Sequence, residues 1–107
     1  KLFAKEVDKD SNGCLQDVHW YAGLFGYFPT YSLGALTAAQ IASQVREDIK
    51  NLDQQIEKGN FDELINWLKL NIHSKASLYS TNEILQQVTN SELNAKYFMD
   101  YIKNRYL

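Results

Sequence analysis

The stretch that decides the fold is TYSLGALTAAQIASQVREDIK, which occupies residues 30–50. Its larger apolar side chains recur at steps of three to five residues, mostly four, and this spacing is typical of one face of a helix. They are Leu33, Leu36 or Thr37, Ile41, Val45 and Ile49. A second, narrow face carries small residues that another backbone could approach closely, namely Gly34, Ala35, Ala38, Ala39 and Ala42. The stretch therefore predicts a helix that is packed on two sides.

The chain after residue 50 begins with two further predicted helices. Residues 51–58 read as a short helix that Gly59 ends in the left-handed conformation. Asn60, with Glu63 three residues later, predicts a capping box at the start of the next helix. The apolar stripe of that helix consists of Phe61, Leu64, Ile65, Leu68 and Ile72.

The last part of the chain predicts two more helices after a loop at residues 77–80. Ser80 and Glu83 form a second capping-box pattern, and Asn90 can end that helix in the left-handed conformation. Asn94 is expected to cap the final helix, whose shared face carries Phe98, Tyr101, Ile102 and Tyr106. No segment alternates apolar and polar residues as a strand does. The predicted fold class is all-α, an irregular bundle of about five helices.

Composition limits the classes of function. A chain of 107 residues is one domain at most, and its net charge of −2 argues against a nucleic-acid or anionic-membrane partner. No apolar run approaches membrane-spanning length. The single cysteine, Cys14, suits a reducing compartment and is expected to be a small buried residue. Because the chain opens with Lys1 and its only methionine is Met99, we expect it to be a piece of a longer protein.

The first 34 residues are irregular. Residues 1–12 read as a helix remnant that runs into a loop, and residues 13–34 hold four of the five glycines and the only proline. A short helical turn is expected at residues 16–22, followed by a tight loop at Gly23 and Gly26 and a helix start at Pro29. Asp8, Asp10, Asn12 and Gly13 match the opening of a calcium-binding loop. The twelfth position of that loop is His19 instead of a glutamate, so a solvated turn is the better interpretation.

Few residues offer chemistry. Only His19 and His73 are present, no His-Glu-x-x-His pair occurs, and the glycines form no phosphate-binding loop. In an irregular turn Asp17 could converge on His19 and fix its tautomer, while Tyr27 and Tyr31 could donate hydrogen bonds to a developing oxyanion. A cluster of aromatic, glycine and proline residues is more typical of a tightly packed turn between helices. Under either interpretation Trp20, Phe25 and Phe28 are expected in the core.

Two segments resemble a known family. Gly13-Cys-Leu-Gln16-Asp17-Val-His19-Trp20 resembles the Gly-x-x-Gln-Asp-x-His-Trp signature of the carboxypeptidase Taq (M32) metallocarboxypeptidases. The segment from Gly26 to Gly34, with Ala38-Ala39-Gln40 after it, is similar to the segment that follows in that family. The resemblance extends to the end of the chain. It implies the C-terminal part of a larger helical zinc-peptidase fold, with residues 13–34 as one wall of the active site and 35–107 as a helical tail.

The resemblance also implies an activity and a cofactor. Members of this family are cytoplasmic enzymes, usually homodimers, that remove C-terminal residues from peptides with a divalent metal, most often zinc. The metal ligands would belong to a His-Glu-x-x-His helix and a glutamate upstream of Lys1, in the N-terminal part of the same protein. The present chain would then contain no metal ligand and would be inactive alone.

By analogy with related helical zinc peptidases, His19 would contact the substrate and Tyr31 would donate to the carbonyl oxygen under attack. Tyr27 is a weaker candidate for the same role, and Gln16 and Asp17 would position His19. His73 is expected to cap a helix or lie at an interface. Three positions depart from the family pattern, with Ala35 in place of asparagine, Thr37 in place of an aromatic residue and Asn90 in place of glycine.

Two alternatives stay open at this point. The chain could be a non-catalytic helical interaction domain that docks a partner on its small-residue helix, or a calcium-binding module that uses residues 8–12.

Overall fold

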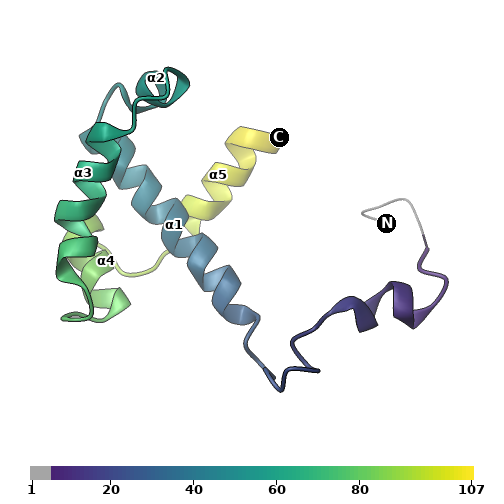
Figure 1. The fold of residues 1–107 in the computed structure, drawn as a ribbon. Helices are drawn as coiled ribbons and strands as arrows, with labels where there is room; N and C mark the ends of the chain where they lie inside the picture. Colours follow the sequence, from purple (N-terminus) through teal and green to yellow (C-terminus); the bar gives the residue numbers. More distant parts are fainter. Residues whose placement is uncertain (1–5) are drawn as a thin grey trace. The chain divides into compact units, whose positions relative to one another are not determined.

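The computed structural model describes residues 6–107 and contains only helices as regular elements in that part of the chain. The five α-helices are α1 (Pro29–Asp48), α2 (Leu52–Glu57), α3 (Asp62–Asn71), α4 (Thr81–Thr89) and α5 (Lys96–Tyr106) (Figure 1). Three single turns of 3₁₀-helix are η1 (Asp10–Asn12), η2 (Cys14–Gln16) and η3 (His73–Lys75). The predicted all-α class with about five helices is confirmed. None of the helices in the described part is long and apolar enough to cross a membrane.

The chain divides into two compact units, residues 1–32 and residues 33–107. The first unit contains η1, η2, the turns after them and the first residues of α1. A helix remnant is expected at residues 1–12, but residues 1–5 lie outside the described residues. Between Glu6 and Asn12 the only helical turn is η1. The second unit contains the rest of α1 and the other α-helices.

The core of the second unit lies on the predicted apolar face of α1. Val45 and Ile49 are buried together with Leu52 of α2, and Ile41 packs against them. From α3, Leu64 and Trp67 cover this cluster, and the indole N–H of Trp67 also donates to the Asp48 carboxylate at 2.7 Å. Leu33 is exposed, so the apolar face of α1 is buried only from its middle onward. The small face is covered no better, because Ala35 and Ala38 are exposed while Ala39 and Ala42 are half-buried.

The side chain of Gln40 joins α1 to the segment between α4 and α5. Gln40 is fully buried, and its amide nitrogen lies 2.9 Å from the hydroxyl oxygens of Thr89 and Ser91 and 3.0 Å from the carbonyl oxygen of Glu92. Its amide oxygen accepts the backbone N–H of Asn94 at 2.9 Å. One buried amide therefore satisfies polar groups of a connection that contains no regular structure.

Most of the predicted helix ends are confirmed. The hydroxyl of Ser80 accepts the backbone N–H of Glu83, and the Glu83 carboxylate accepts the backbone N–H of Ser80. Asn90 and Gly59 adopt φ values of 53° and 73°, as left-handed helix ends require. The prediction at Asn94 is off by one residue: the cap position of α5 is Ala95, which makes no side-chain cap hydrogen bond, although the carboxamide oxygen of Asn94 accepts the backbone N–H of Lys96 at 2.9 Å.

The capping box predicted at Asn60 and Glu63 is wrong. The Asn60 side chain does accept the backbone N–H of Asp62 at 3.2 Å, but the helix begins at Asp62, after Phe61. Glu63 is therefore the second residue of the helix. A capping box needs its glutamate at the third position, where the side chain can reach back to the cap.

The predicted burial of four residues in the first unit is also wrong. Trp20, Phe25 and Phe28 are 68%, 73% and 59% exposed, and Cys14 is exposed as well. A unit of about 30 residues cannot enclose a core by itself, because most of its side chains remain at the surface. Aromatic rings of this unit therefore pack on one another near the surface, as the stacked rings of Trp20 and Phe25 do.

Candidate functional site

A turn after η2 brings Asp17 and His19 together. Asp17 is extended, with φ −72° and ψ 123°, and its Oδ1 accepts the backbone N–H of His19 at 2.7 Å. The same oxygen lies 2.7 Å from Nδ1 of the His19 ring. The helical turn expected at residues 16–22 is displaced. The 3₁₀ turn η2 ends at Gln16, and irregular turns follow it, in which the backbone N–H of Ala22 donates to the carbonyl of Val18 and that of Leu24 to the carbonyl of His19. This irregular backbone lets two side chains converge that would diverge on a regular helix.

The other side of the His19 ring faces two tyrosines. Nε2 of His19 lies 3.3 Å from the hydroxyl oxygen of Tyr31, and the two rings meet edge to face. The Tyr27 ring stacks against His19 with centroids 6.1 Å apart and contacts the Tyr31 ring edge to face at 5.7 Å. Asp17, His19, Tyr27 and Tyr31 therefore form one cluster, which we call the His19 cluster.

The loop at Gly23 and Gly26 and the start of α1 set the positions of the tyrosines. Both glycines have φ near +72°, a conformation that other residues rarely adopt, and they reverse the chain between His19 and Tyr27. Thr30 then donates its backbone N–H and its hydroxyl to the carbonyl oxygen of Tyr27. These bonds fix the first turn of α1, and with it the spacing between Tyr27 and Tyr31.

The His19 cluster combines a fixed carboxylate with accessible hydroxyls. The backbone N–H of His19, and after it the His19 ring, hold the pKa of the Asp17 carboxyl below its ordinary value, so the carboxylate stays ionised at neutral pH. The side chain of His19 is only 23% exposed, whereas Tyr27 and Tyr31 are 47% and 60% exposed. A ligand can therefore reach the two hydroxyls while the imidazole is held behind them.

Gln16 does not join the cluster through a described contact. Its amide donates to the carbonyl oxygen of Ser11, which ties η2 to η1. Gln16 thus supports the backbone that leads into Asp17, and its expected role of positioning His19 is at most indirect.

Residues 6–107 contain no group of three or more histidine, cysteine, aspartate or glutamate side chains that could hold a metal ion. In the segment that resembles a calcium loop, the side-chain amide nitrogen of Asn12 donates to Asp8 at 2.9 Å. This hydrogen bond lowers the pKa of Asp8 and belongs to a compact turn. The described side chains therefore do not fit a metal centre.

The first unit also carries an apolar cavity of about 410 Å³. Its lining consists of Cys14, Leu15, Asp17, Trp20, Tyr21 and Phe28. Asp17 thus lies between this apolar cavity and the His19 ring.

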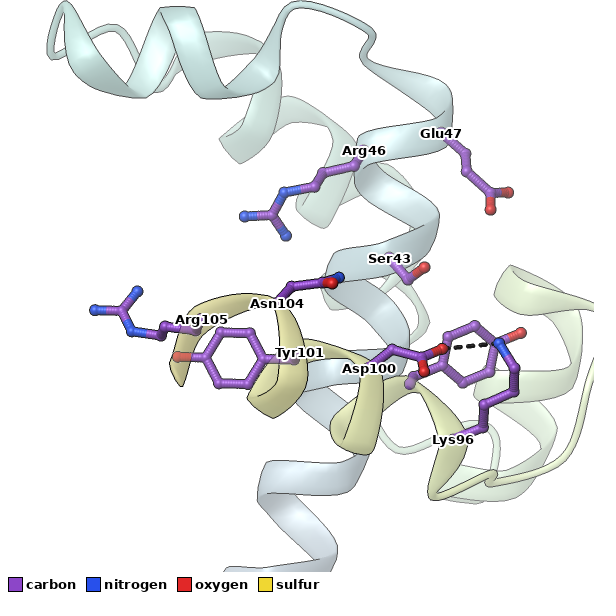
Figure 2. Close-up of a pocket in the computed structure, with 9 residues that line it drawn as sticks. Ser43, Arg46, Glu47, Lys96, Asp100, Tyr101, Asn104 and Arg105 are labelled. Atoms are coloured by element: carbon purple, nitrogen blue, oxygen red, sulfur yellow. Dashed lines mark hydrogen bonds and ion pairs between the residues drawn. The ribbon is translucent and has the colours of Figure 1, made fainter. Parts of the chain in front are cut away.

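A second, polar groove of about 690 Å³ lies between α1 and α5 in the other unit (Figure 2). Lys96 pairs with Asp100 at 2.7 Å within the groove, and Arg46 pairs with Asp53 of α2 at 3.2 Å. The sequence interpretation missed this groove, although the spacing of Tyr97, Tyr101, Asn104 and Arg105 on one face of the last helix could have indicated it. Because two of its cations are already paired, the groove offers less for ligand chemistry than the His19 cluster.

The chain is similar to known metallopeptidases over nearly its whole length. The family described as carboxypeptidase Taq (M32) metallopeptidase matches residues 1–106. Thermostable carboxypeptidase 1 of Pyrococcus furiosus is 38% identical over 107 residues, which is 100% of this chain and 21% of that protein. Carboxypeptidase 1 of Bacillus subtilis is 40% identical over 97 residues, which is 91% of this chain and 19% of that protein.

Solved structures agree with these relatives. Metallocarboxypeptidase 1 of Trypanosoma cruzi matches 98% of this chain with a TM-score of 0.90 and 40% identity, over 22% of its own length. The Pyrococcus furiosus carboxypeptidase in its apo-Mg structure matches 99% of this chain with a TM-score of 0.89 and 37% identity, over 21% of its own length. The chain thus spans about a fifth of the length of the relatives that it matches.

Proposed function

The chain belongs to the carboxypeptidase Taq (M32) metallopeptidase family, and from this premise we propose that it is the C-terminal part of a carboxypeptidase that removes C-terminal amino acids from peptides. Residues 13–34 would form one wall of the active site. The observation that carries this proposal is the line of contacts from Asp17 through His19 to Tyr31, which ends at an exposed tyrosine.

Each member of the His19 cluster has a proposed role. The Tyr31 hydroxyl donates a hydrogen bond to the carbonyl oxygen of the scissile peptide as negative charge develops on it, an interaction that stabilises the transition state more than the ground state. The sequence-based expectation that His19 contacts the substrate directly is replaced by an indirect role, because its two ring nitrogens face Asp17 and Tyr31 and it therefore supports Tyr31. Tyr27 is the weaker second candidate because its ring is stacked against His19, and Asp17 orients the imidazole.

The rest of the active site is proposed to lie outside this chain. The family is one of metallopeptidases, and we propose zinc as the metal, with ligands in the preceding part of a longer polypeptide. Residues 1–107 alone would then hydrolyse no peptide and bind no zinc in stoichiometric amount. We further propose that the longer protein is a cytoplasmic homodimer, which sedimentation and cell fractionation can test.

Substitution of Tyr31 by phenylalanine in the longer protein tests the proposed role. The variant keeps the ring and its contacts with His19 and Tyr27 but loses the donor, so we expect kcat to fall by roughly 10²–10³. Metal content, measured by mass spectrometry, should stay unchanged. Tyr106→Phe is the matched control, because Tyr106 is an exposed residue of α5 in the other unit. Unchanged turnover in Tyr31→Phe would remove Tyr31 from the mechanism.

One observation favours a second candidate, a helical interaction domain. The apolar cavity of the first unit and the exposed rings of Trp20, Tyr21 and Phe25 form a surface that could bind another protein. A longer protein with no peptidase activity under any metal condition, but with a partner that protects Trp20 from quenching, would support this candidate over the enzyme.

A further inference from the structure

The two contacts of the His19 ring determine where its protons lie. An ionised carboxylate can only accept hydrogen bonds, so Asp17 Oδ1 at 2.7 Å requires a hydrogen on Nδ1 of His19. That hydrogen is present in the neutral tautomer with Nδ1–H and also in the imidazolium. Nε2 is therefore the ring atom that gains or loses a proton, and it is the atom that faces the Tyr31 hydroxyl at 3.3 Å.

The direction of the hydrogen bond between His19 and Tyr31 depends on that proton. When Nε2 is unprotonated it can only accept, so the Tyr31 hydroxyl donates to it and presents only its oxygen lone pairs to a ligand. When Nε2 takes a proton from solvent, it donates to the Tyr31 oxygen. The phenolic hydrogen is then released and can turn toward a ligand on the exposed side of the ring.

We propose that protonation of His19 switches Tyr31 from a hydrogen-bond acceptor to a hydrogen-bond donor toward the substrate, and that Asp17 fixes the ring tautomer on which this switch depends. This inference rests on the proposed function, because it specifies when Tyr31 can stabilise an oxyanion. It adds that the imidazolium, and not the neutral imidazole, is the competent form of His19.

Within residues 6–107, the titratable groups that face the His19 ring belong to Asp17, Tyr27 and Tyr31. The Asp17 carboxylate contacts Nδ1 directly at 2.7 Å. Tyr27 stacks on the ring with centroids 6.1 Å apart and an interplanar angle of 28°. The Tyr31 hydroxyl faces Nε2 at 3.3 Å and accepts from Nε2–H when that hydrogen is present.

The switch gives the activity a defined dependence on pH. The donor at Tyr31 is available at low pH and is lost as pH rises and Nε2 gives up its proton. Asp17→Asn removes the negative charge but keeps an oxygen that can accept the backbone N–H and Nδ1–H of His19. The geometry of the turn is thus retained, while the charged imidazole becomes less favourable and the donor is lost at lower pH.

Nuclear magnetic resonance of the longer protein, selectively labelled with ¹⁵N-histidine, tests the switch without any use of activity. We expect neutral His19 to carry its hydrogen on Nδ1, and we expect the Nε2 resonance to move when Tyr31→Phe removes the donated hydrogen bond. At a fixed pH near neutrality, Asp17→Asn should contain less imidazolium at position 19. His73→Gln identifies the resonances of the other histidine of this chain. A neutral His19 with its hydrogen on Nε2 would overturn the proposal.

The pH profile of kcat/KM in the same protein gives the functional test. The fall of kcat/KM at high pH should move to lower pH in Asp17→Asn and stay in place in His73→Gln. In Tyr31→Phe, which has no hydroxyl to switch, the part of that fall that is due to deprotonation of His19 should disappear. A decline that remains unchanged in Asp17→Asn, although the resonances show less imidazolium, would refute the switch. If Tyr31→Phe is fully active, the proposed function fails, while the resonances still show whether the hydrogen bond reverses.

Discussion

Replacement of Gln40 by leucine should destabilise the second unit strongly, because one buried amide holds the connection between α4 and α5. The Gln40 amide has two N–H groups, which its three nearest acceptors share, and one oxygen, which accepts from the backbone of Asn94. It therefore makes the equivalent of three hydrogen bonds. At about 0.5–1.5 kcal/mol for each net bond, their loss amounts to about 1.5–4.5 kcal/mol. Leucine has a similar volume, so little of this comes from a cavity.

Urea unfolding followed by circular dichroism measures this loss as a lower midpoint at an unchanged slope. Amide hydrogen exchange gives the local result, because the Asn94 N–H loses its acceptor; an opening made easier by about 2.7 kcal/mol would speed its exchange roughly 100-fold. Gln44→Leu is the matched control on the same helix, since Gln44 donates only to the Asp48 side chain, one turn away. If Gln40→Leu unfolds at the wild-type midpoint and the Asn94 amide keeps its protection, the account of the Gln40 amide is refuted.

Two further changes test the ends of α4. Ser80→Ala removes the hydroxyl of the capping box and should cost about 0.5–2 kcal/mol in urea unfolding. Because the backbone N–H and hydroxyl of Ser80 lower the pKa of Glu83, this cap stabilises the fold fully above the ordinary pKa of a glutamate and loses that effect as pH falls through the lowered value. Acidification should therefore destabilise Ser80→Ala less than the parent, and an equal loss in both would contradict the role of the cap. Asn90→Gly should match or exceed the parent in melting temperature, because glycine adopts the left-handed conformation without strain. Asn90→Ala should lower the free energy of unfolding by about 1 kcal/mol, because alanine is strained at the φ of 53° that this position adopts. Equal stability of the two variants would show that the left-handed conformation costs alanine nothing at this position.

The helices were predictable because their signals are local. The four-residue spacing of Ile41, Val45 and Ile49 reflects one face of a helix, and the cap at Ser80 involves a partner only three residues away. The role of Gln40 could not be predicted in this way. Its partners lie 49 to 54 residues along the chain, and a glutamine on a helix face gives no sign that it will be buried.

The residues of the candidate site were predictable in part. The resemblance to the family identified His19 and Tyr31, and their spacing alone did not. Their contact at 3.3 Å depends on the reversal at Gly23 and Gly26, and the sequence predicts such a turn but no distance across it. The wrong prediction of burial at Trp20, Phe25 and Phe28 has a different origin, because large aromatic residues are usually buried where a core exists to receive them.

Helix α1 carries both the buried, hydrogen-bonded Gln40 and the proposed donor Tyr31. Gln40 and Tyr31 are nine residues apart along the helix, and they belong to different compact units. The face with Gln40 is held by buried hydrogen bonds, whereas Tyr31 meets only His19 and Tyr27. The helix fixes the origin of the Tyr31 side chain, and the direction of its hydroxyl is left to the contact with His19. That contact is the one that a single proton can reverse, which makes the Asp17–His19 pair, and not the helix, the part of the site that controls Tyr31.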